Sequence, residues 1–589
     1  MNASTPALIP GKTFLYATAF VAFSLLFLFY ISPIGLGDVY WHLNTGRWIW
    51  EHGALPDSDP FTYTQSGNLN ARPGVHSEDY WQRLILHGYW LAQLLFFAVY
   101  TAFGPWGLVV LKALLFLTLY WLVWRAMLKA HVEPLSGLLA ILLMPWLLFR
   151  YDELRPHIFS FIGVVLVYMN MSSALAKLRS GIALPGDLIL LPLIMLLWAN
   201  LHPGFILGWV IIIVMLAGAA FDRWRGINAL ELPALRRLFI WCGIALLASL
   251  ANPLGYAFIT NIGVLQEQYS LGVDEFLPLA EYARMYQQPV LFYGALAIAL
   301  ATMGVLLLRW KYTDPARVFL LIGFTAAGFS AFRYMIFFVL ISLMIVMPHV
   351  LALSKRYIDR ARPLLIAFLL AGMSGLGYLI FQHDAWKQGA VQTNYVPERA
   401  AEWILSQHPP PPLFNAYEYG GYLGWRLNPD YRMFIDPRCL DFEIFNDYQI
   451  ARGGHYQGIF DKYGVNSVVF YFLTPPTNSI PEVALYLLMD NRWDLVYVDK
   501  LTVVVLVRHD RNYFPVMDKL PLLEYLQRVL ERTLATAPED TQAHVEYGRV
   551  LWYRGNVVGA QEHFKTALQI DPQQQAPRLY LDAIRRQEK

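Results

Sequence analysis

The sequence predicts a polytopic α-helical membrane protein with about eleven spans, followed by a small α/β soluble domain and an α-helical repeat tail. Three observations carry this fold class. Of the 589 residues, 57% are hydrophobic and only 15% are charged, which is too apolar for a soluble globular chain. Apolar stretches recur up to residue 381, and beyond it the composition becomes first β-rich and then helical with an internal repeat.

Apolar stretches of about twenty residues predict helices that cross about 30 Å of hydrocarbon. Lys12 precedes the first stretch and no small-residue cleavage site follows it, so we expect an uncleaved first span. The predicted spans are 12–34, 106–128, 134–150, 156–176, 185–201, 203–221, 238–253, 289–309, 315–332, 333–353 and 363–381.

One further apolar stretch, 84–104, is placed by the charges of the loops. If it does not cross, most Lys and Arg of the short loops fall on one side, as in 223–237 and 355–362, and this is the pattern of cytoplasmic loops. If it crosses, every later loop changes side and the pattern is lost. We therefore expect 84–104 to be a helix at the outer interface, where His87 near its start suits the headgroup region.

The same topology sets the domain organisation. It puts the N-terminus in the cytoplasm, leaves one large outer loop at 35–105, and makes 1–381 the transmembrane domain. Runs such as "NSVVFYFL", "DLVYVD" and "TVVVLVRH" predict strands, so 382–515 is expected to be an extracytoplasmic α/β domain.

The tail, 516–589, carries a helical repeat signature. Small and aromatic residues recur at tetratricopeptide positions, where small side chains let two helices pack closely and a proline ends the second. They are Gly548, Gly555, Ala560, Phe564, Ala567 and Pro572. Such repeats usually contact proteins, so a protein partner is expected for this tail.

Asp38 opens the stretch "GDVYWHLNTGRWIWEHG", directly after the first predicted span. One interpretation is a helix N-cap, whose carboxylate accepts backbone N–H bonds worth about 1 kcal/mol. The other is a functional acid at the outer mouth of the bundle, on the same helix face as His42 four residues later. The two interpretations are compatible, because a capping carboxylate also reaches a nearby site.

Further polar residues fall in loops that the topology puts on the same outer side. A charge at the centre of a membrane helix costs about 2.5–3.5 kcal/mol, so the convergence of these residues favours a polar cavity at the outer leaflet. For Asp59 a turn before Pro60 is the alternative, and for Arg333 a structural ion pair. The set comprises Asp59, then Arg150, Asp152, Glu153, Arg155 and His157 in "FRYDELRPH", then His202 and Arg333.

This pattern resembles the GT-C superfamily of polytopic glycosyltransferases, in particular the branch with protein O-mannosyltransferases and lipid A aminoarabinose transferases. The resemblance rests on "GDVYWHLNTGRW" after the first span, on the long outer loop with its interfacial helix, and on "FRYDELRPH" after the third span. It covers about residues 1–380. The sequence resembles a large group of bacterial membrane proteins with C-terminal tetratricopeptide units more strongly still.

The resemblance implies sugar transfer from a polyprenyl-phosphate donor to a protein or glycan acceptor at the outer face of a bacterial inner membrane. It implies that Asp38 is the base or acceptor-orienting acid, and His42 and Asp59 are further catalytic candidates. Loss of the acceptor proton to a carboxylate and arginine binding of a lipid phosphate fit these residue types. The predicted substrate-binding residues are Arg150, Asp152, Glu153, Arg155, His157, His202, Arg333 and His87.

The sequence departs from the family at two points. Many relatives carry a paired acid where "GDVYWH" has one acid, so no cofactor is certain and a divalent metal is disfavoured. Relatives of the aminoarabinose branch often have a His-Pro-Pro motif where "LHGYWLAQ" keeps only His87. The main alternative function is a non-catalytic membrane scaffold that recruits partners through its tail. A transporter ranks last, because the charges gather at one leaflet without internal repeats, and no nucleic-acid partner is expected.

Overall fold

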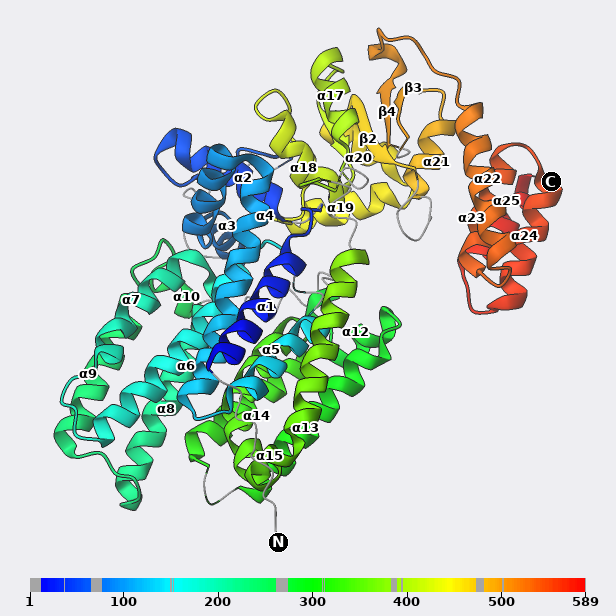
Figure 1. The fold of residues 1–589 in the computed structure, drawn as a ribbon. Helices are drawn as coiled ribbons and strands as arrows, with labels where there is room; N and C mark the ends of the chain where they lie inside the picture. Colours follow the sequence, from blue (N-terminus) through cyan, green and yellow to red (C-terminus); the bar gives the residue numbers. More distant parts are fainter. Residues whose placement is uncertain are drawn as a thin grey trace. The chain divides into compact units, whose positions relative to one another are not determined.

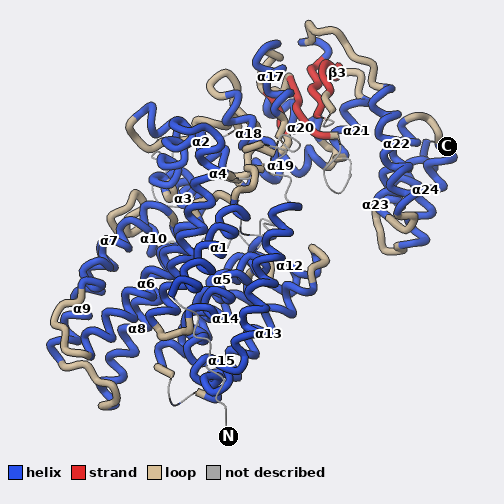
Figure 2. Tube along the Cα trace, viewed as in Figure 1, coloured by secondary structure: helices blue, strands red, loops and turns tan. Residues whose placement is uncertain are grey.

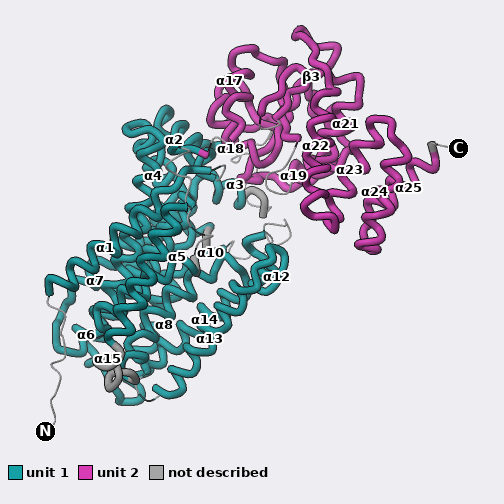
Figure 3. The backbone as a smooth tube through the Cα atoms, turned by 45° about the vertical axis from the view of Figure 1, so that its right-hand side comes forward, with its two compact units in different colours: residues 1–57, 68–391 teal, residues 58–67, 392–589 magenta. Residues whose placement is uncertain are grey.

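The computed structural model describes residues 12–35, 38–64, 77–148, 151, 153–260, 274–309, 311, 313–382, 389–392, 396–472, 481–500 and 503–587. The chain forms two compact units (Figure 3). Unit 1 contains residues 1–57 and 68–391, and unit 2 contains 58–67 and 392–589. The predicted division at 381 and 515 stays a prediction, but the unit limits already assign a piece of the outer loop to unit 2.

Unit 1 is entirely helical over its described elements (Figures 1 and 2). Long helices form the bundle, and short ones lie in the loops between them. The elements are α1 (Lys12–Tyr30), α2 (Val39–His52), α3 (Ser77–His87), α4 (Trp90–Lys129), α5 (Pro134–Leu148), α6 (His157–Arg179), α7 (Gly186–Leu201), η2 (Pro203–Phe205), α8 (Ile206–Arg225), α9 (Leu232–Ala248), α10 (Ala257–Thr260), η4 (Asp274–Phe276), α12 (Leu279–Met285), α13 (Pro289–Leu308), α14 (Pro315–Ser330), η6 (Phe332–Tyr334) and α15 (Met335–Gln382).

The composition of this bundle is that of a membrane-embedded protein. Among the described residues, 7 helical segments are long and apolar enough to cross a membrane, and three shorter apolar helices accompany them. Large apolar side chains remain exposed on the outside of the bundle, such as Phe20 at 74% and Phe381 at 84%. A soluble protein rarely exposes so much apolar surface, so a lipid environment accounts for it.

The region predicted as one interfacial helix, 84–104, is divided in the structure. A turn at Gly88 and Tyr89 separates α3 from α4, and Gly104 has the positive φ of 64° that separates α4 into two parts before Pro105. Gly88 is required by close packing, because a Cβ there would lie 2.5 Å from the Leu84 carbonyl oxygen. The interfacial position of the first part stays a prediction.

Unit 2 contains a four-stranded sheet with helices packed against it (Figure 1). The strand order is β1-β2-β4-β3, with β1 parallel to β2 and the other pairs antiparallel. Buried valine-rich runs such as "SVVFY" form strands because β-branched side chains pack well on a covered sheet. The elements are α17 (Glu398–Gln407), β1 (Leu413–Asn415), α18 (Tyr417–Leu427), α19 (Phe442–Arg452), α20 (Tyr456–Tyr463), β2 (Ser467–Tyr471), α21 (Glu482–Met489), β3 (Trp493–Val498), β4 (Val503–Arg508) and η7 (His509–Arg511).

A short piece of the outer loop, residues 58–64, belongs to unit 2, and we call it the strap. Thr62 forms a parallel β-bridge with Met433. The Met433 amide donates to the Phe61 carbonyl oxygen at 2.9 Å, and the Tyr63 amide donates to the Met433 carbonyl oxygen at 3.1 Å. Unit 2 is therefore built from two regions separated by more than 300 residues in the sequence.

Four helices end the chain: α22 (Leu520–Thr536), α23 (Thr541–Tyr553), α24 (Val557–Ile570) and α25 (Ala576–Gln587). The last three share a core in which Phe564 and Ala567 of α24 are fully buried. Gly548 permits the close contact of α23 with α24, because a Cβ there would lie 2.6 Å from the Phe564 ring.

Candidate functional site

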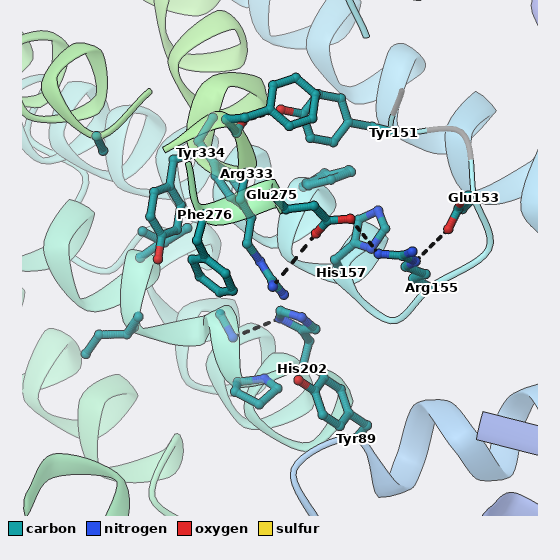
Figure 4. Close-up of a pocket in the computed structure, with 18 of the residues that line it drawn as sticks. Tyr89, Tyr151, Glu153, Arg155, His157, His202, Glu275, Phe276, Arg333 and Tyr334 are labelled. Atoms are coloured by element: carbon teal, nitrogen blue, oxygen red, sulfur yellow. Dashed lines mark hydrogen bonds and ion pairs between the residues drawn. The ribbon is translucent and has the colours of Figure 1, made fainter. Parts of the chain in front are cut away.

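Unit 1 encloses a cavity of about 260 Å³ where several helix ends and loops meet (Figure 4). Polar and charged side chains lie on one part of its wall, and aromatic and aliphatic side chains cover the rest. The lining residues are Trp81, Leu84, Tyr89, Tyr151, Glu153, Arg155, His157, Phe161, His202, Pro203, Gly204, Ile206, Leu207, Glu275, Phe276, Ala327, Phe332, Arg333, Tyr334 and Phe337.

Arg155 is the centre of the charge network. Its Nε lies 3.3 Å from Asp38 Oδ2 and 2.6 Å from Glu153 Oε2, and its Nη1 donates to Glu275 Oε1 at 2.8 Å. Burial alone would lower the pKa of Arg155, but the carboxylates of Asp38, Glu275 and Glu153 raise it above its ordinary value. Arg155 therefore remains a cation that holds three acids in one network, two of them on the cavity wall.

Arg333 approaches Glu275 from the opposite side (Figure 4). Its Nη1 lies 3.9 Å from Glu275 Oε2, and its guanidinium lies over the Phe276 ring at 4.9 Å from the centroid. Burial would raise the pKa of Glu275, but Arg155 and Arg333 together lower it, so this carboxylate is ionised. With 35% of its side chain exposed, Arg333 still faces the open volume of the cavity.

A helix break positions Arg333. Helix α14 ends at Ser330, Ala331 adopts extended backbone angles, and η6 starts the next helix. The aromatic ring of Phe332 stacks on Tyr151 and on Tyr282, at 5.0 Å and 3.9 Å between centroids. The Tyr151 hydroxyl also donates to the Phe332 carbonyl oxygen. These contacts fix the break and direct the arginine between its neighbours into the cavity.

His157 and His202 also stand at helix starts or ends on the cavity wall. His157 is the first residue of α6, and its Nε2 is buried with no hydrogen-bond partner among the described residues. His202 follows α7, and its Nδ1 accepts a hydrogen bond from the Gly204 amide at 2.8 Å. Figure 4 shows the His202 ring facing the guanidinium group of Arg333.

Asp38 precedes α2 at the N-cap position but its side chain makes no capping hydrogen bond. Its carboxylate pairs with Arg155 instead, and 26% of each side chain is exposed. Asp38 is not among the lining residues, so it adjoins the cavity through Arg155. The capping interpretation is therefore wrong for the side chain, because a guanidinium charge attracts the carboxylate more strongly than backbone amides do.

Three predicted site residues have other surroundings. His42 is buried and lies 3.3 Å from the Gln93 amide nitrogen through its Nδ1, and His87 Nε2 lies 2.9 Å from the Pro56 carbonyl oxygen. Asp59 is in unit 2, where both its oxygens accept from Arg438 and from the strap backbone or Thr62. None of the three lines this cavity, and their catalytic and binding roles stay predictions.

Arg150 and Asp152 lie outside the described residues. The structure adds Glu275, which was not predicted and lies in "GVDEFLP", between the predicted spans 238–253 and 289–309. The aromatic residues Tyr89, Tyr151 and Phe276 were missed as well. A single acid in a long loop carries no signal until the loop is folded against Arg155.

No group of three or more His, Cys, Asp or Glu side chains with metal-binding geometry occurs among the described residues. The acids around Arg155 are each within ion-pair distance of a guanidinium group, and this neutralises the charge that a divalent cation would need. The residues present therefore fit a metal ion poorly.

No family model matches this sequence, and no curated protein matches it at a significant level.

Proposed function

We propose that this protein is a membrane glycosyltransferase of GT-C type. It moves a sugar from a polyprenyl-phosphate donor to a protein or glycan acceptor at the outer face of a bacterial inner membrane. The proposal includes about eleven spans, a cytoplasmic N-terminus and extracytoplasmic C-terminal domains. Membrane lipids and the donor are its partners, and nucleic acid is not.

One observation carries the proposal: Arg155 connects Asp38 on one side to Glu275 and Arg333 on the other. Transfer of a sugar needs an acid that accepts the acceptor proton and a cation that receives the phosphate charge. This network contains both within one connected group, beside a cavity large enough for a sugar ring.

The chemistry follows from these groups. The acceptor hydroxyl donates its hydrogen bond to Asp38, which Arg155 orients. The hydroxyl oxygen bonds to the anomeric carbon as the bond from that carbon to the phosphate oxygen breaks. The proton passes to Asp38, and the phosphate leaves with its electron pair toward Arg333, whose guanidinium stabilises the charge.

The apolar part of the cavity lining supports a lipid donor. The cavity is lined by Ile206, Leu207, Phe161 and Phe337, which come from helices α6, α8 and α15 of the apolar bundle. An isoprenoid chain needs such an apolar surface beside the cation that binds its phosphate.

The helical tail supports the tetratricopeptide part of the proposal. Its small residues lie where two helices touch, as Gly548 does against Phe564. We assign to this tail a protein partner, and to the α/β domain a role in guiding the acceptor.

The proposal is tested with the purified full-length protein and a panel of polyprenyl-phosphate-linked sugars. The measured quantity is the rate at which polyprenyl phosphate is released. We expect Asp38→Asn to lower the rate at least about a hundredfold, since it removes the base. Asp57→Asn is the matched control, because Asp57 is an exposed acid of the same loop that does not line the cavity.

Full activity of Asp38→Asn would remove Asp38 from the mechanism. Absence of release with every donor, together with a protein partner captured through α22–α25, would favour the scaffold instead.

A further inference from the structure

His202 occupies a fixed hydrogen-bond environment between α7 and η2. The Gly204 amide lies 2.8 Å from its Nδ1, and Ser160 Oγ lies 2.7 Å from the same atom. A backbone N–H group is always a donor, so Nδ1 acts as an acceptor and carries no proton. The ring proton of neutral His202 is therefore on Nε2.

The bond from Ser160 has a fixed direction as well. Trp198 Nε1 donates to Ser160 Oγ at 2.9 Å, and an indole nitrogen never accepts. Ser160 thus receives one hydrogen bond from Trp198 and directs its own hydroxyl proton to His202 Nδ1. Two donors, the serine hydroxyl and the Gly204 amide, converge on one ring nitrogen.

Close packing keeps this arrangement rigid. A Cβ at Gly204 would lie 2.3 Å from Ser160 Oγ and 2.8 Å from His202 Nδ1. Trp198 is enclosed by two further glycines, since a Cβ would lie 2.4 Å from its ring at Gly163 and 2.8 Å at Gly208. Gly163 and Gly208 let α6 and α8 approach the indole that begins the chain of hydrogen bonds, and Gly204 lets η2 approach Ser160.

We propose that Ser160, Trp198 and the Gly204 amide are positioning groups that lock His202 as the neutral Nε2–H tautomer. His202 then serves the cavity as a permanent hydrogen-bond donor, and neither as a general base nor as a cation. The identity of the acceptor rests on the proposed function: it is an oxygen of a phosphodiester that Arg333 also binds. The lock itself does not depend on that function.

The surroundings of His202 oppose its protonation. Among the described residues, the titratable or charged groups that face it are Arg333 of η6, His157 of α6 and Tyr89 before α4. Burial lowers the pKa of His202 well below the ordinary histidine value, and the charges of Arg333 and His157 lower it further. A second proton would have to enter at Nδ1, where the Gly204 N–H bond already points.

Two donors facing one space select the ligand. The Arg333 guanidinium and the His202 N–H both lack acceptor atoms, so an anionic oxygen fits between them. A neutral donor adds specificity without adding charge, and its strength does not vary with pH.

Solid-state NMR of the full-length protein in lipid bilayers, with ring-¹⁵N histidine, tests the lock. The chain has 14 histidines, and His202→Gln identifies the signal of His202 by its loss. An ordinary histidine with a pKa near 6.5 is about nine-tenths protonated at pH 5.5. We expect His202 to show one protonated and one bare nitrogen from pH 8 down to pH 5.5.

Ser160→Ala removes one of the two donors, so the protonated fraction of His202 at pH 5.5 should rise several-fold. Ser172→Ala is the control, because Ser172 lies on the same helix and its buried hydroxyl has no hydrogen-bond partner among the described residues. A wild-type signal that titrates between pH 6 and 7, or a proton on Nδ1, would overturn the lock. An unchanged signal in Ser160→Ala would remove Ser160 from it.

Binding of citronellyl methyl phosphate distinguishes the tautomer lock from the proposed phosphodiester donor. This diester carries a single charge that is constant over the pH range. Dimethyl phosphate, which lacks the lipid chain, is the second probe. We expect the lipid diester to bind more tightly, with an affinity that is constant from pH 5.5 to 8 and about tenfold weaker in His202→Gln. A locked tautomer without diester binding would uphold the lock and overturn the proposed donor.

Discussion

Replacing Asp59 by alanine should open the strap of unit 2 without unfolding the rest of the protein. Asp59 and Arg438 have side chains that are 1% and 0% exposed, and the two Arg438 bonds to Asp59 measure 2.8 and 3.1 Å. The same carboxylate accepts from the Phe61 and Thr62 amides and from the Thr62 hydroxyl. The substitution removes all of these bonds at once.

The size of the effect on strap opening depends on the contacts that Arg438 keeps after the substitution. A hydrogen bond to a charged group contributes about 1.5–3 kcal/mol, so two to Arg438 set the scale. Arg438 still donates hydrogen bonds of 2.5–2.9 Å to Asp436, so the arginine is not left as a lone buried charge. We therefore expect strap opening to become easier by about 3 kcal/mol, at the low end of the range for broken buried pairs.

Hydrogen exchange of the full-length protein measures this opening at the Tyr63 and Met433 amides, whose partners lie across the strap contact. A cost of about 3 kcal/mol corresponds to exchange about a hundredfold faster. Asp57→Asn changes an exposed acid two residues away and should leave both amides within about threefold of wild type. Exchange in Asp59→Ala that also stays within threefold of wild type would show that Asp59 does not hold the strap closed.

Gly46→Ala should separate α2 from α4 and lower the melting temperature of unit 1 by several degrees, because its Cβ would lie 2.2 Å from the Gln93 carbonyl oxygen. Gly294→Ala is the control: its Cβ would meet nothing within 4 Å, so this variant should be neutral or stabilising. An unchanged melting temperature in Gly46→Ala would contradict this packing. Burial raises the pKa of Glu546 to about 7, so folded α23 binds a proton that the unfolded chain has lost, and tail stability should fall as pH rises from 4.5 to 7. Glu546→Gln should abolish that slope in thermal unfolding and exposed Glu562→Gln should keep it; equal slopes in both would refute the assignment.

Some of the candidate site could be predicted because it lies at breaks between apolar segments. Arg155, His202 and Arg333 each interrupt or border a hydrophobic run, and a polar residue at such a place must face water, a partner or a site. Their meeting around one cavity agrees with that expectation. His42 shows the limit of prediction from spacing. Helical spacing puts it on the same face as Asp38, whereas in the structure its ring contacts Gln93.

The sequence by itself determined where apolar helices form and where buried strands follow, because both depend on the composition and period of adjacent residues. The tertiary structure alone decided that Asp38 pairs with Arg155, that Glu275 joins two arginines, and that Asp59 is used in another unit. Ion pairs and tautomers depend on atoms a few ångströms apart in space, and residues separated by hundreds of positions come that close only after folding.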